Sequence, residues 1–374
     1  MKRIRLGDAC DILNGFAFKS DKYVEDGIRI IRIANVQKGY IEENAPAFYP
    51  IDSVGLEKYM LEEGDLLMSL TGNVGRVACL QKEMLPAALN QRVACLRLKV
   101  DRITKGFLFH ILNSDFFEQQ CVQASNGVAQ KNISTEWLKD YEIPLYSIEE
   151  QLKITDILDK VRRIIISRND ELSALDNLIK ARFVEMFGNP DINEKKWNEY
   201  KMEQLCEVGS SKRIYQNDQS LTGIPFLRIS DLVNRMDTGS KGCDLFIPEE
   251  LFGKLKKQGL VPVRGDILLT ARGTLGRCYI IQDEDEFYFQ DGMITWLSKY
   301  DEKITPLYIS YLFEMPGFRK QIDSLQAGST VAYLSISMTK KLNVMTPPIE
   351  LQDQFADFVR AVDKSKFGKL NTRS

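Results

Sequence analysis

The most regular hydrophobic pattern in the sequence is a run of apolar residues near the middle of the chain, spaced alternately four and three residues apart. Its members are Ile154, Leu158, Val161, Ile165, Leu172, Leu175, Ile179 and Met186, and only Arg168 and Arg182 interrupt it. A mean spacing of 3.5 residues is typical of a helix that packs along a coiled-coil seam. Ile157, Ile164 and Leu178 lie beside this seam and widen the apolar face, as in helices that pack in a bundle.

Polar signals mark both ends of this predicted helix. Ser147 and Glu150 have the spacing of a capping box, in which each side chain bonds a backbone amide of the first turn. Gly188 and Pro190 end the pattern, because glycine adopts the left-handed cap and proline cannot continue a helix. The sequence therefore predicts a helix of roughly 39 residues, about 58 Å long, within residues 147–188.

The segments on either side of the long helix have mixed patterns. Runs rich in β-branched and aliphatic residues at 28–36, 65–70 and 92–98 predict short strands, and glycine, asparagine and proline separate them. Residues 107–122 and 306–325 instead follow a helical period. Together these patterns predict globular units of the α/β (α+β) class with short strands.

The two mixed segments repeat each other. Gly-Asp-Leu-Leu at 64–67 recurs as Gly-Asp-Ile-Leu at 265–268, and Gly-Asn-Val-Gly-Arg at 72–76 recurs as Gly-Thr-Leu-Gly-Arg at 273–277, both 201 positions later. The start of the long helix, Ile-Glu-Glu-Gln at 148–151, recurs at the same offset as Ile-Glu-Leu-Gln. A period this long indicates a duplicated domain and not a solenoid or a propeller.

The second copy of the helix is shorter than the first. It begins after Thr346-Pro347-Pro348, and Phe355, Phe358, Val359 and Val362 stand where Ile154, Ile157, Leu158 and Val161 stand in the first copy. From Asp363 onward the pattern becomes polar, so we expect a helix about half as long. The predicted organisation is a globular domain at 1–146, a long helix at 147–188, a second domain at 189–346 and a shortened helix at 347–374.

Composition narrows the class of protein. The seven cysteines are odd in number, widely spaced and never in a Cys-x-x-Cys pair, which argues against a disulfide framework and a structural zinc site. The N-terminus has no apolar signal segment, and no apolar run approaches the roughly 20 residues that span a bilayer, so we expect a cytoplasmic protein. The formal charge of −2 argues against a simple nucleic-acid binder unless a partner subunit supplies part of the phosphate contacts.

The sequence offers little for catalysis. The single histidine, His110, lies in an apolar helical pattern and is expected to be structural, which excludes histidine-based triads and multi-histidine metal sites. There is no phosphate-binding Gly-x-x-x-x-Gly-Lys loop and no Asn-Pro-Pro-Tyr motif of DNA methyltransferases. Asp191 and Glu194 could in principle hold a nuclease metal, but they lie in a polar linker. We expect no catalytic centre, metal site or cofactor in this chain.

Taken in order, several motifs carry a family resemblance. The chain resembles the specificity (S) subunit of type I restriction-modification systems over essentially its whole length. The matching residues are Arg5-Leu6-Gly7-Asp8, Phe16-Ala17-Phe18, Glu63-Gly64-Asp65-Leu66-Leu67, Gly72-Asn73-Val74-Gly75-Arg76, Leu89-Asn90-Gln91-Arg92-Val93, the Glu150-Gln151 pair, and Arg182-Phe183-Val184-Glu185-Met186-Phe187-Gly188-Asn189-Pro190.

The resemblance implies two target-recognition domains held apart by two long antiparallel coiled-coil helices in a pseudo-twofold arrangement. It further implies a double-stranded DNA target read in two halves, docking of methyltransferase (M) subunits, two in number, and restriction (R) subunits in the complete enzyme. S-adenosylmethionine, ATP and magnesium are expected on those partner subunits. The alternative class is a stand-alone bipartite DNA-binding regulator.

Base reading in the major groove needs Arg, Lys, Asn, Gln, Ser or Thr side chains that reach base edges. The first-domain candidates are Thr71, Asn73, Arg76, Asn90, Gln91, Arg92, Gln130 and Lys131. The second-domain candidates are Arg272, Thr274, Arg277, Gln290, Ser329 and Thr330. The competing interpretation is that the two Gly-x-x-Gly segments are tight turns with solvated arginines.

The apolar positions beside the helix seam are the candidate partner-binding residues. They are Ile157, Ile164, Leu178 and Phe358. Most seam residues are expected to pack the two helices together, which leaves the wider face for partners. Because the second helix is short, we expect it to cover only part of the first, with the rest completed by an M subunit or by a second copy of the chain.

Overall fold

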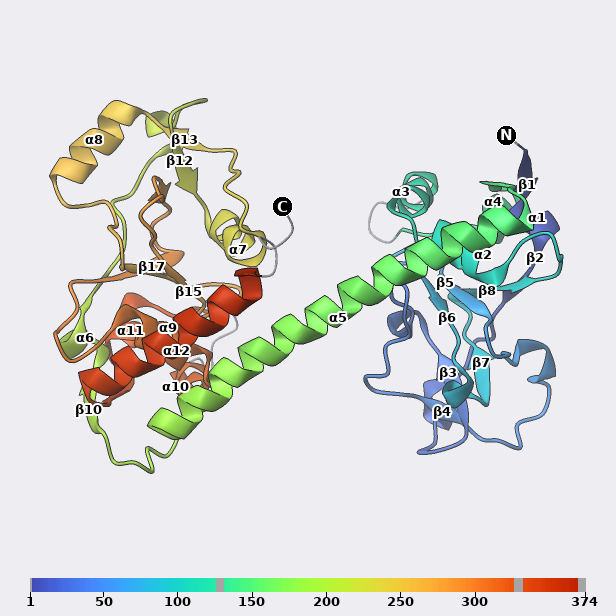
Figure 1. The fold of residues 1–374 in the computed structure, drawn as a ribbon, viewed down its shortest axis with the longest axis horizontal. Coiled ribbons are helices and arrows are strands. Elements are labelled where there is room, and N and C mark those ends of the chain that lie inside the picture. The colour runs from blue at the N-terminus through green and yellow to red at the C-terminus, as the bar shows by residue number, and fades with distance from the viewer. Residues whose placement is uncertain (1, 126–130, 326–331, 369–374) are drawn as a thin grey trace. The chain divides into compact units, whose positions relative to one another are not determined.

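The computed structural model describes residues 2–125, 131–325 and 332–368 and divides the chain into two compact units, Met1–Ser167 and Arg168–Ser374. The long helix α5 (Ile148–Phe187) contributes its first half to the first unit and its second half to the second (Figure 1). Each unit contains one mixed domain and is described by itself.

The first unit is built from short strands with helices on the side of α5. Its elements before α5 are β1 (Arg3–Arg5), α1 (Leu6–Ala9), β2 (Cys10–Asn14), β3 (Ile28–Ile31), β4 (Phe48–Tyr49), β5 (Leu66–Ser69), β6 (Val77–Cys79), β7 (Ala87–Leu89), β8 (Val93–Leu98), α2 (Lys105–Leu112), α3 (Asp115–Ala124), α4 (Thr135–Asp140) and β9 (Glu142–Pro144).

Three sheets organise these strands. An antiparallel sheet has the order β2-β8-β5-β6, a mixed sheet has the order β4-β3-β7, and β1 pairs with β9. Side chains alternate along β5, so that Leu66 and Met68 join the core formed with α2 and α3 while Leu67 joins the core toward the mixed sheet. The strand β5 is therefore buried on both faces and lies at the centre of the domain.

The second unit repeats this plan. Its elements besides α5 are β10 (Asn198–Lys201), α6 (Met202–Leu205), β11 (Glu207–Gly209), β12 (Ile224–Leu227), α7 (Ile229–Thr238), β13 (Phe246–Ile247), α8 (Glu249–Lys257), β14 (Ile267–Thr270), β15 (Cys278–Ile280), β16 (Tyr288–Phe289), β17 (Ile294–Ser298), α9 (Pro306–Glu314), α10 (Pro316–Leu325), α11 (Ile336–Lys340), β18 (Asn343–Thr346) and α12 (Ile349–Gly368). The sheets are β11-β17-β14-β15, β13-β12-β16 and β10-β18, which match those of the first unit strand for strand.

Two of the helices predicted from the sequence are each broken in the structure. The helical pattern at 107–122 is α2 followed by α3, because Ser114 starts a new helix by accepting a 3.2 Å hydrogen bond from the amide of Phe117. The pattern at 306–325 is α9 followed by α10, which begins at Pro316. The strand expected at 28–36 ends at Ile31 and gives way to a 3₁₀ turn, Ile33–Asn35.

The ends of α5 are those predicted. Ser147 and Glu150 form the capping box, with hydrogen bonds of 3.0 Å from the Ser147 amide to Glu150 and 3.3 Å from the Glu150 amide to Ser147. Gly188 follows the last turn with a φ of 83°, the left-handed conformation that glycine adopts readily. The helix α5 has 40 residues, and α12, within the residues that the structure describes, has 20.

Each domain holds the start of its following helix through one buried glutamine. Gln151 accepts a 2.8 Å bond from the Thr104 amide and donates to the carbonyl oxygens of Arg102 and Tyr146 at 2.8 and 3.0 Å. Gln352 makes the same three bonds, at 2.9, 2.8 and 2.9 Å, with partners that each lie 201 positions later in the chain. This repeated glutamine clamp fixes the correspondence between α5 and α12.

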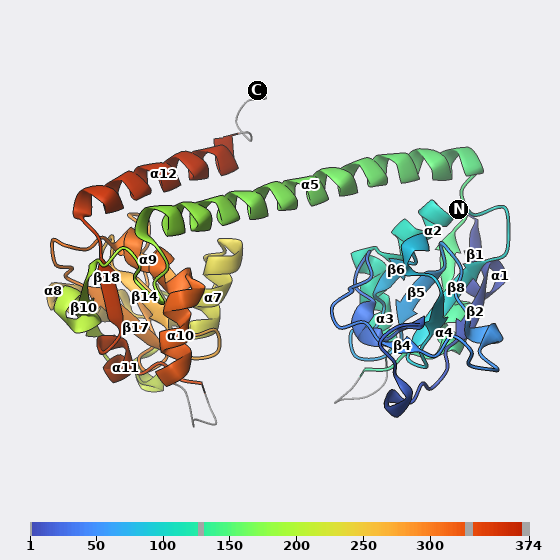
Figure 2. The ribbon, with the colours of Figure 1, turned by 90° about the horizontal axis from the view of Figure 1, so that it is seen from below.

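Within the second unit, α12 runs antiparallel to the second half of α5 (Figure 2). Phe355 contacts Phe183 and Phe187 near the end of α5, whereas Lys366 reaches Asp176 at 2.7 Å, further toward its start. The core between them includes Ile179 and Val359. Of the helices that the structure describes, none combines the length and apolar character needed to cross a membrane.

Candidate nucleic-acid interface

A tight turn connects β5 to β6 and carries the first Gly-x-x-Gly segment. Gly72 and Gly75 have φ angles of 73° and 85°, which L-residues with side chains rarely adopt. The Ser69 hydroxyl stabilises the turn by accepting a 3.1 Å bond from the Arg76 amide, and the Gly75 amide donates to the Ser69 carbonyl at 3.0 Å. The side chain of Asn73 is exposed at the tip.

The turn between β14 and β15 has the same construction. Thr270 takes the place of Ser69 and accepts a 2.9 Å bond from the Arg277 amide, while Gly273 and Gly276 have φ angles of 70° and 74°. Thr274 is exposed at this tip, as Asn73 is at the other. The interpretation of both segments as tight turns is therefore confirmed, and each turn presents a different polar side chain to solvent.

The aspartate of each repeated Gly-Asp motif is buried at the start of the strand that leads to the turn, at the opposite end of that strand. Asp65 accepts bonds of 2.9 and 2.6 Å from the Arg97 guanidinium and one of 2.8 Å from the Glu62 amide. Asp266 instead accepts from the Trp296 indole at 2.8 Å and the Val263 amide at 2.9 Å, and burial raises its pKa. These aspartates fix the chain where it enters the central strand, which accounts for the repetition of the motif.

Further candidates gather beside the first turn. The Gly72 amide donates to the Lys131 carbonyl at 3.0 Å, and the Thr71 hydroxyl bonds the side chain of Asn132 at 3.3 Å. The Leu70 amide donates to the Arg92 carbonyl at 3.1 Å. The structure thus brings Thr71, Asn73, Gln91, Arg92 and Lys131 to one end of the domain, where all except the half-buried Thr71 are exposed; the half-buried Asn90 precedes Gln91.

The second domain places Arg272 at the corresponding end. Arg272 pairs with Tyr333 through the backbone, and its exposed guanidinium lies 5.2 Å from the centre of the Tyr333 ring. A cation held over an aromatic face stays ordered without losing its hydrogen-bond donors. Gln290 is half-buried, and its backbone amide donates to the Leu227 carbonyl at 2.9 Å. The candidates Gln130, Ser329 and Thr330 lie outside the described residues.

The two arginines that end the turns face other protein groups. The Arg76 guanidinium bonds the side chain of Gln37. The Arg277 guanidinium bonds Asp237 at 2.6 Å, and this charged hydrogen bond lowers the pKa of the Asp237 carboxyl. In each of these arginines, at least one of the guanidinium donors is thus already engaged by a protein group.

Asn132 and Arg213 were not among the DNA-binding residues predicted from the sequence. Asn132 is adjacent to Lys131 and bonds Thr71, as described above. Arg213 is exposed and forms a 2.8 Å ion pair with Asp291, next to Gln290. The basic pair Lys212-Arg213 was the available signal.

Three of the four partner-binding candidates are exposed on α5. They are Ile157, Ile164 and Leu178. Phe358 is half-buried on α12, where the Arg182 guanidinium lies 5.7 Å from the centre of its ring. His110 lies against α5, with Nε2 2.7 Å from an oxygen of Asp159, so it joins two helices of the first unit.

The described residues contain no group of three or more His, Cys, Asp or Glu side chains arranged to hold a metal ion. In the linker considered for a nuclease, the Asp191 carboxylate pairs with Lys320, and Glu194 accepts a 3.0 Å bond from the Asn189 amide. These contacts account for both carboxylates as structural groups of the turn after α5.

A domain present twice, with the same turn built in each copy and different polar side chains at its tip, defines a duplicated recognition protein. The comparison with protein families makes the class specific. The chain belongs to the family of the type I restriction modification DNA specificity domain, whose model matches residues 1–176 and 194–373. Both copies of the domain are thus matched.

Individual relatives agree with the family. The chain is 30% identical to the type I restriction enzyme MjaVIII specificity subunit of Methanocaldococcus jannaschii over 47% of its own length, and it spans only 43% of that protein. It is 22% identical to the EcoBI specificity subunit of Escherichia coli over 97% of its length and 78% of that subunit. The fold is similar to a crystal structure of the type I restriction-modification S subunit from M. genitalium, with a TM-score of 0.54, 15% identity and coverage of 98% and 90% of the two chains.

Proposed function

We propose that this chain is the sequence-specific DNA-recognition subunit of a type I restriction-modification enzyme, and that each of its domains reads one half of a bipartite target. The observation that carries this proposal is the duplicated turn. The turn has equivalent hydrogen bonds at Ser69 and at Thr270. Its exposed side chain differs between the two copies. Two readers of common design and different side chains suit two half-sites of different sequence.

The proposed partners are double-stranded DNA, M subunits, two per complex, and R subunits in the restricting form. The exposed apolar residues of α5, Ile157, Ile164 and Leu178, are the proposed contacts for M subunits. The chemistry would then belong to the partners, which would bind S-adenosylmethionine, ATP and magnesium. The net charge of −2 fits this division, because the partners would supply part of the phosphate contacts.

A stand-alone DNA-binding regulator is the alternative considered from the sequence. The relatives described above are all named as specificity subunits. Their names support the restriction-modification role over that of a stand-alone regulator. The exposed apolar face of α5 also favours a chain that works within an assembly.

The experiment that tests the proposal is a map of methylated bases in the organism that carries this chain, with and without its gene. The expected result is that deletion abolishes methylation at one bipartite motif and that a copy of the gene restores it. A copy carrying Gly75→Asp serves as the variant, because an added Cβ there would lie 2.8 Å from the Cys121 Cβ and distort the turn. An unchanged methylation map after deletion would refute the proposal.

A further inference from the structure

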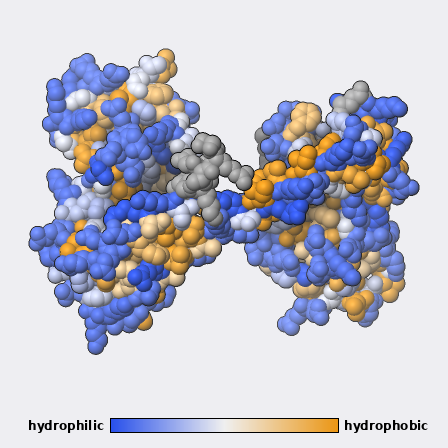
Figure 3. All heavy atoms as spheres, viewed as in Figure 1, coloured by the Kyte–Doolittle hydropathy of each residue, from blue (hydrophilic) through white to orange (hydrophobic). Residues whose placement is uncertain are grey.

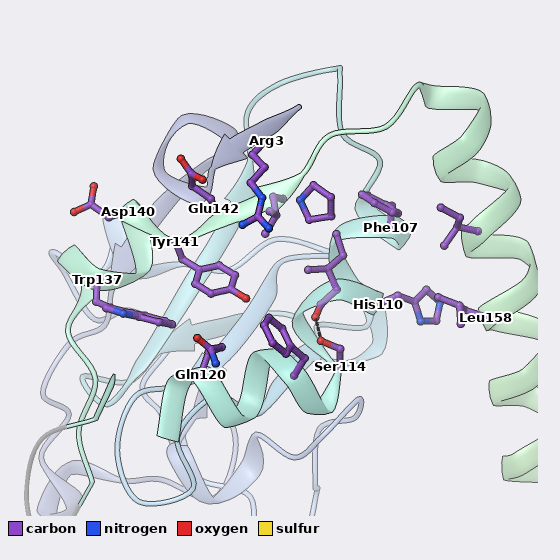
Figure 4. Close-up of a pocket in the computed structure, with 15 residues that line it drawn as sticks. Arg3, Phe107, His110, Ser114, Gln120, Trp137, Asp140, Tyr141, Glu142 and Leu158 are labelled. Carbon is purple, nitrogen blue, oxygen red and sulfur yellow. Dashed lines mark hydrogen bonds between the residues drawn. The ribbon is translucent and has the colours of Figure 1, made fainter. Parts of the chain in front are cut away.

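A deep apolar groove lies in the first unit beside the first half of α5 (Figure 4). It has a volume of about 710 Å³, and its apolar lining includes Phe107, Trp137 and Ile154. The groove continues into the exposed apolar residues of α5, which Figure 3 shows gathered along the helix. It therefore belongs to the surface proposed above for M subunits. A different contact of the same half of α5 links this helix to the turn between β5 and β6.

Arg162 makes this contact and does not line the groove. Its Nη2 donates a 2.6 Å hydrogen bond to the carbonyl oxygen of Gly39, a residue 123 positions earlier in the chain. Its guanidinium also lies 4.9 Å from the centre of the Phe109 ring on α2. The side chain is half-buried, and a hydrogen bond from a charged donor is stronger than one between neutral groups. Arg162 is thus fixed between α2 and the backbone at Gly39.

Gly39 belongs to a tight turn formed by residues 37–40, hereafter the linking turn. The Gln37 amide donates to the Tyr40 carbonyl at 3.0 Å, which closes the turn. Gly39 has a φ of 88°, a conformation that favours glycine. Lys38 pairs with two carboxylates of α3, at 2.5 and 2.8 Å. The bond from α5 is therefore made to a compact turn whose backbone and side chains have partners of their own.

The linking turn in turn contacts the turn between β5 and β6, residues 72–76, hereafter the recognition turn. The Gly39 amide donates to the Val77 carbonyl at 2.8 Å, directly after the recognition turn. The Arg76 guanidinium donates to the side-chain oxygen of Gln37. A continuous path of hydrogen bonds therefore runs from α5 through the linking turn to both the backbone and a side chain at the end of the recognition turn.

The second unit lacks this path among the residues that the structure describes, where no hydrogen bond or ion pair joins α12 to residues 237–242. Asp363 stands on α12 where Arg162 stands on α5, 201 positions later, and it pairs with Lys366 of its own helix at 3.1 Å. Arg277 is bound by Asp237 at the end of α7, and a hollow of about 600 Å³ adjoins this arginine. The two recognition turns are thus built alike but supported differently.

We propose that Arg162 is a positioning residue for DNA reading, which fixes the recognition turn of the first domain from α5. It acts through Gly39 and the linking turn, and the second domain reads its half-site without an equivalent support from α12. The reading of one half-site is therefore sensitive to a change in α5, and the reading of the other is not. The inference rests on the proposed function, because it adds a residue to one of the two DNA-reading sites.

Hydrogen exchange of the full chain tests the path without DNA. Arg162→Ala should speed exchange of the Gly39 and Arg76 amides about tenfold, because the charged bond that holds the linking turn is lost. The Arg277 amide, in the second recognition turn, should exchange as before. Arg163→Ala is the matched control, since it removes the same charge from the next residue of α5, which is exposed and bonds the Asp159 carbonyl of the same helix. It should change none of these amides.

The second measurement uses the complex assembled with M subunits and the bipartite target found by methylation mapping. Competition with DNA in which each half-site is scrambled in turn measures discrimination. Arg162→Ala should lower discrimination at one half-site about three- to tenfold and leave the other unchanged, whereas general destabilisation would weaken both. Gln37→Ala should act on the same half-site. The double variant should lose no more than the larger single variant, because both changes interrupt one path.

Four results would each overturn the inference while the proposed function stands. They are unchanged exchange at Gly39 and Arg76, equal effects of Arg162→Ala and Arg163→Ala, reduced discrimination at both half-sites, and additive losses in the double variant with Gln37→Ala. A wild-type complex that shows no preference for either half-site would instead refute the proposed function, and the inference with it.

Discussion

At the scale of single residues, the hydrogen bonds separate exposed candidates for base reading from those that already have partners. Arg272 is exposed and stacked on Tyr333, whereas Arg277 is paired with Asp237. Because a base contact needs free donors, the structure ranks Arg272 above Arg277. The sequence could not make this distinction, since Asp237 lies 40 positions before Arg277 and nothing local pairs them.

The first prediction compares these two arginines in the assembled complex. Arg272→Ala should lower discrimination at one base pair by about 1 to 3 kcal/mol, the usual contribution of a base-reading arginine. Arg277→Ala should leave the sequence preference unchanged, because it removes an ion pair with Asp237 that is partly exposed and of little energetic weight. Competition binding with single-base variants of the target measures both. The reverse order of effects would contradict the ranking.

A second prediction concerns the glutamine clamp. Gln151→Ala removes three hydrogen bonds and leaves the amide of Thr104 without an acceptor, so it should destabilise the first unit by about 1 to 3 kcal/mol. Gln119→Ala, at an exposed position of α3, is the matched control and should change stability by less than about 0.5 kcal/mol. Urea unfolding, with hydrogen exchange at the start of α5, measures the difference, and similar values for the two variants would argue against the clamp.

At the scale of elements, the sequence predicted best where a local signal exists. Both ends of α5 were predicted because the capping box and Gly188 act within one turn of the helix. The break between α2 and α3 was missed because Asn113 and Ser114 are not strong breakers and the apolar period continues across them. Sheet order was beyond reach, since β2 pairs with β8 across about 80 residues of chain and no local pattern encodes that pairing.

The third prediction compares two equivalent positions, Phe355 on α12 and Ile154 on α5. Phe355 is fully buried between Phe183 and Phe187, so Phe355→Ala should destabilise the second unit by about 3 to 5 kcal/mol. Its counterpart Ile154 is half-buried beside the groove, and Ile154→Ala should destabilise the first unit by only about 1 to 2 kcal/mol. Thermal unfolding followed by calorimetry compares the two. Losses of equal size would mean that the groove beside Ile154 is already filled in solution.

At the scale of the whole molecule, duplication predicts that the half-sites are read independently. Arg92→Ala should reduce preference for one half-site only, and Arg272→Ala for the other only, because the two residues belong to separate units. The double variant should show the sum of the two losses, since distant sites contribute additively. Binding to DNA with either half-site scrambled measures this, and a single variant that relaxes both halves would rule out independent reading.

The two-stranded sheets have a consequence for how such a protein can diversify. In the first domain Ile4 pairs with Ile143, and in the second Tyr200 pairs with Val344, so each domain is closed where its chain enters and leaves. The helices α7 and α8, which have no helix of the same length at the equivalent place in the first domain, lie between these strands. Genetic exchange of the segment between the paired strands would therefore change the DNA-reading residues of a domain and leave the sequences of α5 and α12 unchanged.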